Sequence, residues 1–436
     1  MKLETKREIL SAVMEDFTAE NLEALTEKGL DKLAETLEIN WEDYKETPKC
    51  GEPVYSTDKE IFYIQYKDIK VIKVVTKMSD TSPLATREFS YEINEDARKF
   101  TPPGFVDVEQ WIKSRVIPKN RAFVGQILSS VSLSDNPFEV VRVSFGLAVT
   151  DNYWIVPEWF TGTFAEYNLH ENDFSEALAL VAFTGHTQKI KALRSSPELS
   201  TDGMLAKCWR RINGKNILYK SGMSGAGNLG YEPYSEFYVW QIAAKMGLNA
   251  IQYNIEHFSE KLCSTCEAFT SVCKSFSPYS QYLGHHGLNE VIKNMKSLGF
   301  YEKFAEMLVL DAIICNSDRH LGNFGFVYNK ESGFVDFAPI FDNGFGLLPQ
   351  AYDKDWMSIE NLEAYANDRI SAFDISHTNI LRAIITQKLK TKVSRLIKFK
   401  FTRHLHFNLE ESRLILLEEY VQRRVREILV MPNASE

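Results

Sequence analysis

The sequence predicts an α+β protein with two consecutive lobes, a small sheet lobe and a helical lobe, and with an additional N-terminal helical and α/β region before them. A length of 436 residues suits two or three domains. A strand, a turn, a second strand and a helix follow one another over residues 204–246, and an apolar helical stretch follows over 301–315. We expect four parts, in chain order an acidic helical segment, an α/β region, the small lobe and the helical lobe, over residues 1–45, 46–195, 196–272 and 273–436.

The composition is that of a globular, non-exported chain. Hydrophobic residues make up 44%, and 50 basic against 59 acidic side chains leave a net charge of −9. This charge argues against a surface that binds nucleic acid or anionic lipid as a whole. The charged N-terminus lacks a signal-peptide core, apolar windows are too short for a membrane span, and six cysteines suit a reducing compartment. We therefore expect a cytoplasmic protein with free thiols and no membrane span.

The first 45 residues have apolar side chains at helical spacing, and residues 29–39 have the cadence of a helix-turn-helix. Six Lys or Arg against twelve Asp or Glu make the segment acidic. Phosphates would repel such a helix, so we do not expect direct DNA binding. A helical cap or a partner-docking element is the favoured interpretation.

Residues 46–195 mix strand-like and helical patterns and show no catalytic constellation. The segment 115–121 contains arginines at both ends and suits either an anion site or a surface turn, of which we favour the turn. The strand-like runs lie at 61–64, 69–75 and 140–149, and a helix is expected at 108–114.

The small lobe places a lysine and a glutamate on adjacent elements. Lys220 ends the second strand of the expected hairpin, and a glycine-rich linker over 222–230 leads to a helix that begins around Pro233 and ends at Gly247. Glu236 lies in the first turns of that helix. Kinase folds use this geometry to hold a lysine against nucleotide phosphates, although two surface charges would give the same pattern.

The helical lobe supplies the remaining groups for phosphoryl transfer. The apolar helix 301–315 runs into a polar loop that holds Asp318 and Asn323, and a hairpin then leads to Asp342. The reaction needs a carboxylate that orients the attacking hydroxyl, and an amide and a second carboxylate that hold Mg²⁺ on the phosphates. Asp318, Asn323 and Asp342 offer these groups in that order.

These motifs resemble the HipA-like serine/threonine kinases, whose catalytic loop reads Asn-x-Asp-x-His-x-x-Asn and whose metal aspartate follows Ala-Pro-x-x-Asp. Here the residues are Asn316, Asp318, His320 and Asn323, then Ala338-Pro339-Ile340-Phe341-Asp342. The resemblance implies ATP and Mg²⁺ as cofactors and a protein Ser or Thr hydroxyl as acceptor. It also implies Asp318 as the catalytic base with His320 beside it, Asn323 and Asp342 as metal ligands, and Lys220 as the phosphate-contacting lysine.

The same resemblance points to a loop before the hairpin that covers the nucleotide phosphates. The candidate nucleotide-binding residues in it are Ser200, Thr201, Asp202 and Gly203. The loop has a single glycine, which departs from the family pattern. Members of the family switch themselves off through a serine in this loop, so we expect inhibitory phosphorylation here, with Ser200 as the first choice. Family members also belong to toxin-antitoxin pairs, which implies an antitoxin-like regulatory partner.

A strand over 261–269 is expected to lead into the hinge between the lobes, where the backbone groups of Glu267 and Phe269 would meet an adenine. The same stretch contains Cys263 and Cys266, whose spacing invites a zinc interpretation. No second pair of cysteines with this spacing follows, and a structural zinc ion normally takes four ligands. We therefore favour the hinge.

Two rival functions share part of this pattern. Lipid kinases of the phosphatidylinositol type use the same Asp-Arg-His catalytic loop, and a lipid or small-molecule kinase would need a surface for its substrate. The candidate surface is a run of seven basic residues between 388 and 403 with no acid among them. Apolar residues interleave with them as core-facing positions, so we favour a solvated helix face. A non-catalytic nucleotide-binding scaffold is disfavoured because each expected catalytic position is filled.

Overall fold

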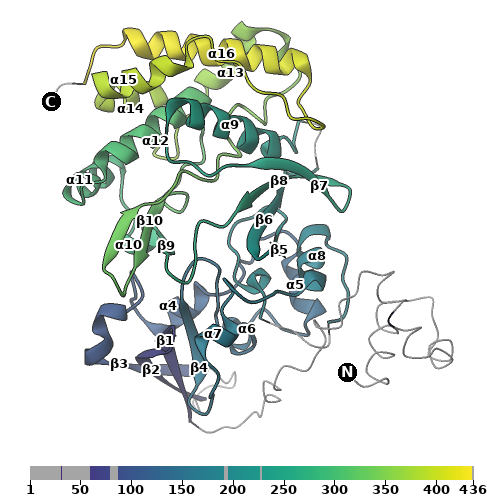
Figure 1. Ribbon diagram of the computed structural model, residues 1–436, viewed down its shortest axis with the longest axis vertical. Helices are drawn as coiled ribbons and strands as arrows, with labels where there is room; N and C mark the ends of the chain where they lie inside the picture. The colour runs from purple at the N-terminus through teal and green to yellow at the C-terminus, as the bar shows by residue number, and fades with distance from the viewer. Residues whose placement is uncertain (1–30, 32–58, 79–86, 191–194, 226–227, 435–436) are drawn as a thin grey trace. The chain divides into compact units, whose positions relative to one another are not determined.

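The computed structural model contains two compact units (Figure 1). The first comprises Met1–Met204 with Cys208–Gly214, and the second comprises Leu205–Lys207 with Lys215–Glu436. The predicted acidic helix over residues 1–45 lies outside the described residues, apart from Asp31. The residues that the structure describes are 31, 59–78, 87–190, 195–225 and 228–434.

The first unit contains a four-stranded antiparallel sheet in the order β3-β2-β1-β4. Its inner face is apolar, with Ile64, Tyr66 and Val74 fully buried, because side chains that alternate along a strand reach the same face of the sheet. The strands predicted at 61–64 and 69–75 are therefore confirmed. The four strands are β1 (Glu60–Tyr66), β2 (Ile69–Met78), β3 (Arg87–Ile93) and β4 (Tyr153–Pro157).

Short helices complete this unit, and the helix predicted at 108–114 is confirmed as α4. The strand predicted at 140–149 is wrong, because α6 occupies Pro137–Ser144. Asn136 caps this helix by accepting a hydrogen bond from the Phe138 N–H, and Pro137 suits its first position. The helices and the last strand of the unit are η2 (Glu95–Phe100), α4 (Val108–Lys113), α5 (Val124–Ser130), α6 (Pro137–Ser144), α7 (Phe164–Tyr167), α8 (Glu176–Thr184), η3 (Pro197–Leu199) and β5 (Lys207–Ile212).

The two arginines that end the segment 115–121 are buried, so the predicted surface turn is wrong. Arg115 forms a bidentate ion pair with Asp151, at 2.6 and 2.9 Å. Arg121 lies 2.8 Å from a carboxylate oxygen of Glu198, with both side chains almost completely inaccessible. Buried charges need partners of this kind, and these arginines are fixed structural groups rather than an open anion site.

The second unit begins with a sheet in which β6 (Lys215–Ser221), β8 (Lys261–Glu267) and β7 (Asn254–Phe258) lie antiparallel in that order. A tight turn at Asn213 and Gly214 leads into β6, and both residues have positive φ, as a two-residue hairpin turn requires. The first strand of the predicted hairpin starts at Lys207 rather than at residue 204. The helix predicted after it is α9 (Glu232–Met246), which ends at Gly247 with φ 75°.

A smaller sheet lies in the segment that links the polar loop over residues 316–323 to Asp342. Its antiparallel strands are β9 (Ser275–Pro278), β10 (Gly325–Asn329) and β11 (Phe334–Phe337), in the order β11-β10-β9. The hairpin predicted between Asn323 and Asp342 is confirmed as β10 and β11. It returns the chain towards the point where the catalytic loop begins.

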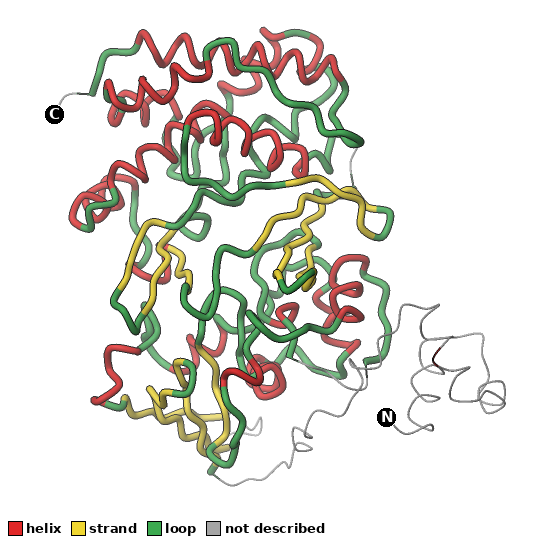
Figure 2. The backbone as a smooth tube through the Cα atoms, in the orientation of Figure 1, coloured by secondary structure: helices red, strands yellow, loops and turns green. Residues whose placement is uncertain are grey.

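Helices form the rest of the second unit, and most of them lie above its strands in the view of Figure 2. α9 and the apolar α12 lie in one continuous core with α16, and α12 ends at Cys315, as predicted from the apolar run. No helix among the described residues is long and apolar enough to cross a membrane. The helices are α10 (Tyr279–Leu283), α11 (Leu288–Ser297), α12 (Tyr301–Ile314), η4 (Asp355–Met357), α13 (Ile359–Asn367), α14 (His377–Ile384), α15 (Gln387–Val393), η5 (Ser394–Leu396) and α16 (Glu411–Val430).

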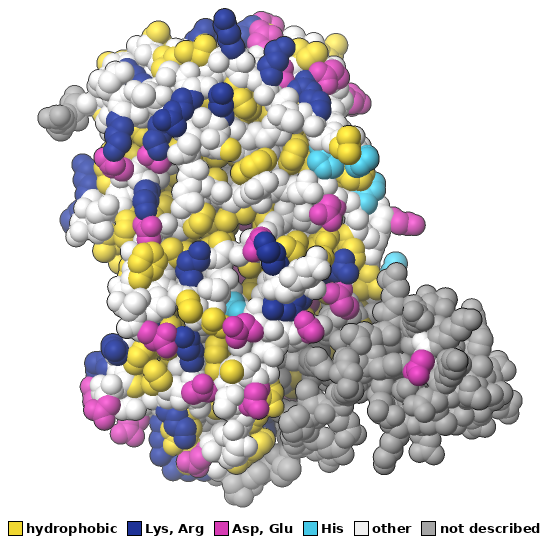
Figure 3. All heavy atoms as spheres, in the orientation of Figure 1, with side chains coloured by type: hydrophobic (Ala, Val, Ile, Leu, Met, Phe, Trp, Pro, Cys, Tyr) yellow, Lys and Arg dark blue, Asp and Glu magenta, His cyan; other side chains and the backbone are white. Residues whose placement is uncertain are grey.

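The basic run over 388–403 is not an open cationic surface. Lys388 and Lys392 form ion pairs of 2.6 and 2.7 Å with Glu302 and Glu306 of α12. Arg403 is paired in the same way with two glutamates of α16. Figure 3 shows basic and acidic side chains interspersed over this helical part of the molecule. Three of the seven basic side chains are thus neutralised by glutamates, and Lys390 and Arg395 donate to backbone carbonyls, which weakens the run as a lipid-binding surface.

Candidate active site

Lys220 is the central cation of the candidate site. It lies near the end of β6, opposite Ser264 of β8, and is 8% exposed. Its Nζ is 3.1 Å from Oε1 of Glu236 and 2.5 Å from Oδ1 of Asp342. Burial acts to lower the pKa of Lys220, but the two carboxylates outweigh burial and raise it above its ordinary value. Lys220 is therefore a fixed, fully charged group.

Glu236 connects the lysine to the segment that follows Asp342. It lies just over one turn inside α9 and is completely buried. While Oε1 accepts from Lys220, Oε2 accepts a hydrogen bond of 2.9 Å from the Asn343 N–H. Burial raises the pKa of Glu236, and the Lys220 ammonium opposes this rise without cancelling it. The lysine, the helix and the Asp342–Asn343 backbone are thus held by one carboxylate.

Asp342 adopts a left-handed backbone conformation, with φ 52°, that a residue with a side chain rarely adopts. Its N–H donates to the hydroxyl of buried Tyr253 at 3.2 Å, which helps to hold this conformation. Burial raises the pKa of the Asp342 carboxyl, but Lys220 and Lys207 outweigh burial and lower it to about 2. The carboxylate is therefore ionised at neutral pH and presents a second oxygen that accepts no hydrogen bond from the described residues.

The polar loop after α12 is folded by its own side chains. Cys315 ends the helix in a left-handed conformation, with φ 55°. Asn316 then accepts a hydrogen bond from the Asp318 N–H at 3.0 Å, and the amide of Asn323 donates to the Asp318 carbonyl at 2.8 Å. Burial raises the pKa of the Asp318 carboxyl, and the neighbouring His320 offsets only part of this rise. His320 itself is exposed, beside Asp318 in the loop.

Arg319 joins this loop to the Asp342 segment and is the largest functional group that the sequence reasoning missed. Its guanidinium is fully buried and lies 3.0 Å from Asp311 of α12. It donates hydrogen bonds to the carbonyls of Asn323 and Phe341 and to the Asn343 side chain, at 3.0, 2.5 and 2.5 Å. One signal was available in the sequence: Asp311 is the one charged residue in the apolar run over 307–315, and a buried acid there calls for a buried cation.

The predicted metal ligands offer a donor set that suits Mg²⁺. Asn323 uses its amide nitrogen on Asp318, which leaves its amide oxygen without a hydrogen bond among the described residues. Asp342 has one carboxylate oxygen on Lys220 and the other available. Mg²⁺ takes few protein ligands beside phosphate and water oxygens. The described part of the chain contains no group of three or more His, Cys, Asp or Glu arranged to hold a metal.

The expected hinge lies at the end of β8. Glu267 is the last residue of the strand, and its side chain points to Lys215 at 2.7 Å, which leaves only its backbone for a nucleotide. Phe269 forms an aromatic cluster with Phe276 and Phe341, at ring-centroid distances of 5.4 and 5.6 Å. Because Phe341 precedes Asp342, this apolar cluster lies along the chain directly beside the charged groups.

The loop residues Ser200, Thr201, Asp202 and Gly203 belong to the first unit, where local hydrogen bonds hold them. The Ser200 hydroxyl donates to the Leu147 carbonyl at 2.7 Å, and the Thr201 hydroxyl donates to the Pro197 carbonyl at 2.6 Å. Asp202 accepts a hydrogen bond from the Gly203 N–H at 2.6 Å. Arg121 adds a hydrogen bond to the Thr201 carbonyl. The structure thus shows a well-anchored loop, and its role in nucleotide binding stays a prediction.

A second buried carboxylate, Glu232, lies one turn before Glu236 and was also missed. Its Oε2 accepts a hydrogen bond from the Met223 N–H at 3.1 Å, at the start of the glycine-rich linker. A Cβ on Gly222 would lie 2.6 Å from this oxygen and 2.6 Å from Cα of Gly230, so only glycine fits there. Gly222 and Gly230 therefore lie against each other, and Glu232 of α9 holds the start of the linker through the Met223 N–H.

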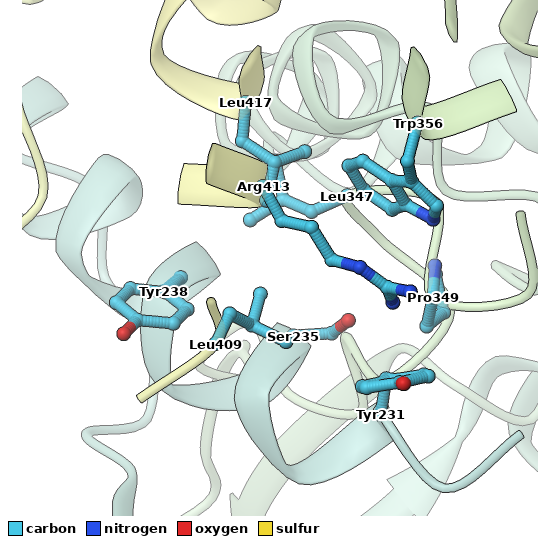
Figure 4. Close-up of a pocket in the computed structure, with 9 residues that line it drawn as sticks. All are labelled: Tyr231, Ser235, Tyr238, Leu347, Pro349, Trp356, Leu409, Arg413 and Leu417. Atoms are coloured by element: carbon cyan, nitrogen blue, oxygen red, sulfur yellow. The ribbon is translucent and has the colours of Figure 1, made fainter. Parts of the chain in front are cut away.

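A small hollow lies beside the N-terminal end of α9, and Figure 4 shows the residues that line it. Arg413 of α16 crosses it, with its guanidinium carbon 4.8 Å from the ring centre of Tyr231 and 5.2 Å from that of Trp356. The same guanidinium is 3.0 Å from Asp353. Because the arginine stacks between two aromatic rings, this hollow is filled by the protein itself and helps to position α9.

Comparison with known proteins gives two named relatives. The chain is similar to the serine/threonine-protein kinase CtkA of Helicobacter pylori (strain J99), with 29% identity over 136 residues, which are 28% of this chain and 42% of that protein. The match therefore spans less than half of the relative's length. A crystal structure of a Helicobacter pylori proinflammatory kinase CtkA matches at 21% identity and a TM-score of 0.41, over 51% of this chain and 91% of that chain.

The HipA protein of Shewanella oneidensis MR-1, solved with HipB and its operator DNA, matches at 13% identity and a TM-score of 0.48, over 85% of this chain and 97% of that chain. No protein-family model matches this chain. The curated kinase relative confirms the resemblance to the HipA-like serine/threonine kinases that the catalytic motifs indicated. The mixture of helices and several sheets confirms the predicted α+β class.

Proposed function

We propose that the protein is an ATP- and Mg²⁺-dependent kinase that transfers the γ-phosphate to a Ser or Thr hydroxyl of a protein. The observation that supports this most strongly is the position of Lys220, whose ammonium is held between the buried Glu236 and the ionised Asp342. A lysine held in this way suits the binding of nucleotide phosphates next to a metal-binding carboxylate. The similarity to a curated serine/threonine kinase supports the same conclusion.

Each residue would then have a separate task. Lys220 would bind the phosphates, and Asp342 and the Asn323 amide oxygen would hold Mg²⁺, which supplies charge neutralisation on the phosphoryl group when bound. Asp318 would orient the acceptor hydroxyl and take its proton as the oxygen attacks the γ-phosphorus, while the bond from that phosphorus to the bridging oxygen breaks and ADP leaves. Its raised pKa brings the carboxyl closer to the range in which a general base works efficiently. Arg319 would hold the loop that contains Asp318 at a fixed position relative to the segment that contains Asp342.

The hinge and the phosphate-covering loop complete the proposal. The backbone at Glu267 and Phe269 would contact the adenine beside the Phe269–Phe276–Phe341 cluster, and the loop from Ser200 to Gly203 would cover the phosphates. An antitoxin-like regulatory partner and a cytoplasmic location stay predictions of the family resemblance and of the sequence composition.

Radiolabelled ATP with Mg²⁺ tests the proposal, using the purified chain alone, with cell extract and with lipid vesicles. Label in protein Ser or Thr is expected. Asp342→Ala should abolish transfer while the folded state persists, because it removes a metal ligand that is partly exposed. Asp336→Ala is a matched control, since Asp336 of β11 pairs with Lys303 and holds no proposed role. Label in lipid only, or full transfer by Asp342→Ala, would contradict the proposal.

A further inference from the structure

A polar hollow lies beside the loop that contains Asp318. Among its lining residues are Ser317, Gln350, Tyr365 and Arg369, with Leu348 and Pro349 as apolar lining. Ser317 directly precedes Asp318, and Leu348 to Gln350 follow the Asp342–Asn343 segment along the chain. Any acceptor whose hydroxyl reaches Asp318 must therefore pass close to this hollow, since a general base acts within hydrogen-bond distance.

The hollow is small and open. The space inside it is about that of one water molecule, far below the roughly 300–1,000 Å³ that is usual for a pocket that encloses a whole ligand. A ligand would therefore contact the side chains at its rim from outside. A protein acceptor, whose chain runs over the surface, suits such a rim better than a free metabolite, which needs an enclosing pocket.

The hollow carries a positive charge and no negative charge. Arg369 is the single charged residue among those that line it, and no acid lines it. Within the described part of the chain, the Arg369 guanidinium forms no ion pair and donates no hydrogen bond. It lies 4.5 Å from the ring centre of Tyr365, a cation–π contact that orients the guanidinium and leaves its N–H groups available. Arg426 of α16 is also exposed and unpaired among the described residues, but it does not line the hollow.

Two further polar groups of the hollow are also available. The Ser317 hydroxyl makes no hydrogen bond to any residue that the structure describes, although the side chain is half-buried. Gln350 uses its amide nitrogen on the sulfur of Met223, which leaves its amide oxygen unused. A guanidinium and a hydroxyl together present donors to a carboxylate, and such charge-assisted hydrogen bonds are among the stronger ones.

The backbone at one side of the hollow is strained. Leu348, which lines the hollow, and the preceding Leu347 both have positive φ, 59° and 60°, which residues with side chains rarely adopt. The Leu347 N–H donates to the carbonyl of Ile314, the last residue of α12, at 2.6 Å. Strained backbone of this kind persists where surrounding contacts enforce it, and it is found preferentially at sites that hold a ligand.

We propose that this hollow is the specificity site for the protein acceptor, and that Arg369 and Ser317 bind the carboxylate of an Asp or Glu close in sequence to the phosphorylated Ser or Thr. This inference rests on the proposed function, because it names the substrate class of that same site. It also explains how an acidic acceptor approaches Asp318 and the nucleotide phosphates. The cation of Arg369 offsets the repulsion that these anionic groups would exert.

The test is a positional-scanning peptide library with one Ser acceptor, in which each of the four residues on either side is fixed in turn as Glu, Lys or Ala. The wild type is expected to prefer Glu at one or two positions. Arg369→Glu should lower kcat/KM for that acidic peptide by about tenfold or more and favour Lys there, with an unchanged KM for ATP. Arg369→Lys should retain part of the preference, because it keeps the charge but loses the forked donor geometry.

Arg426→Glu is the matched control, because it reverses an exposed arginine of α16 that does not line the hollow. It should keep the wild-type preference. Phosphorylation without charge preference, or a preference that survives Arg369→Glu, would overturn the specificity site and leave the kinase proposal intact. If the wild type labels neither peptide nor protein with Mg²⁺ and ATP present, the kinase proposal itself fails, and the specificity site fails with it.

Discussion

Arg319 and Asp311 form a buried ion pair, with Nε of the arginine 3.0 Å from Oδ2 of the aspartate and both side chains at most 3% exposed. The pair links α12 to the loop that carries Asp318. The remaining donors of Arg319 reach the backbone on both sides of the candidate site, so its position determines the distance between the proposed base and the proposed metal ligands.

The first prediction concerns this pair. Arg319→Ala leaves the Asp311 carboxylate buried without its partner, which typically costs about 3–5 kcal/mol in the free energy of unfolding. We expect a loss of this size by urea denaturation, together with a large loss of turnover under conditions where the variant stays folded. Asp311→Asn, which keeps the shape and an acceptor, should lose less than Asp311→Ala. A stability within 1 kcal/mol of the wild type in Arg319→Ala would contradict the structural role.

The second prediction separates binding from chemistry. Asp318→Asn keeps the hydrogen bonds of the loop, which use the backbone of residue 318, and removes the proton acceptor. Turnover should fall by about two to four orders of magnitude while ATP affinity, measured by calorimetry, stays within a few-fold. Because the pKa of Asp318 is raised, wild-type turnover should decline on the acid side at a pH above the ordinary range of an aspartate. Lost ATP binding with unchanged turnover would instead make Asp318 a structural residue.

The third prediction follows from the depressed pKa of Asp342, about 2 against an ordinary value of 3.8. A carboxyl with a lower pKa in the folded state stabilises the fold above its unfolded pKa, and this contribution is lost as pH falls through the folded pKa. The advantage of the wild type over Asp342→Asn in free energy of unfolding should therefore be full at neutral pH. It should shrink between about pH 4 and pH 2, as urea titrations at several pH values would show. A constant difference over this range would contradict the ion pair with Lys220.

Much of the candidate site could be predicted because its residues lie close to one another in the sequence. Lys220 and Glu236 lie on consecutive elements, and Asp318 and Asn323 lie in one loop, so each pair needed only a correct strand or helix boundary. The structure brings Lys220 and Glu236, which that reasoning paired, into contact, and it adds Asp342, whose contact with Lys220 the sequence did not predict.

Of the groups that were missed, Tyr253 has a partner far away in the chain, because it meets the Asp342 backbone only in the folded protein. Glu232 and Arg319 have near partners, Met223 and Asp311, but these contacts join a helix to a loop, and residue spacing alone does not predict them. The run 140–149 was misjudged for a related reason. Its β-branched residues favour a strand weakly, whereas a capping asparagine followed by a proline starts a helix more strongly.

The last prediction concerns Ser200. Its hydroxyl donates to the Leu147 carbonyl, in a loop that Arg121 and Glu198 anchor inside the first unit. A phosphate has no proton to donate in this position at neutral pH and carries close to two negative charges, so a phosphorylated Ser200 cannot keep this hydrogen bond. Phosphorylation should therefore release the loop from its anchored position. If the loop covers the nucleotide as proposed, the released loop also loses its contacts to the phosphates, and activity falls.

Mass spectrometry after incubation with ATP and Mg²⁺ would locate the modification, and the phosphorylated fraction should bind ATP more weakly than the unmodified protein. Ser200→Ala should stay active for longer in the presence of ATP, and Asp318→Asn should remain unmodified if the protein phosphorylates itself. Thr201→Val is the control, because it removes the neighbouring hydroxyl while leaving Ser200 in place. Phosphate on Ser200 with undiminished ATP affinity, or an active enzyme that never carries phosphate between residues 195 and 203, would show that this loop is not a switch.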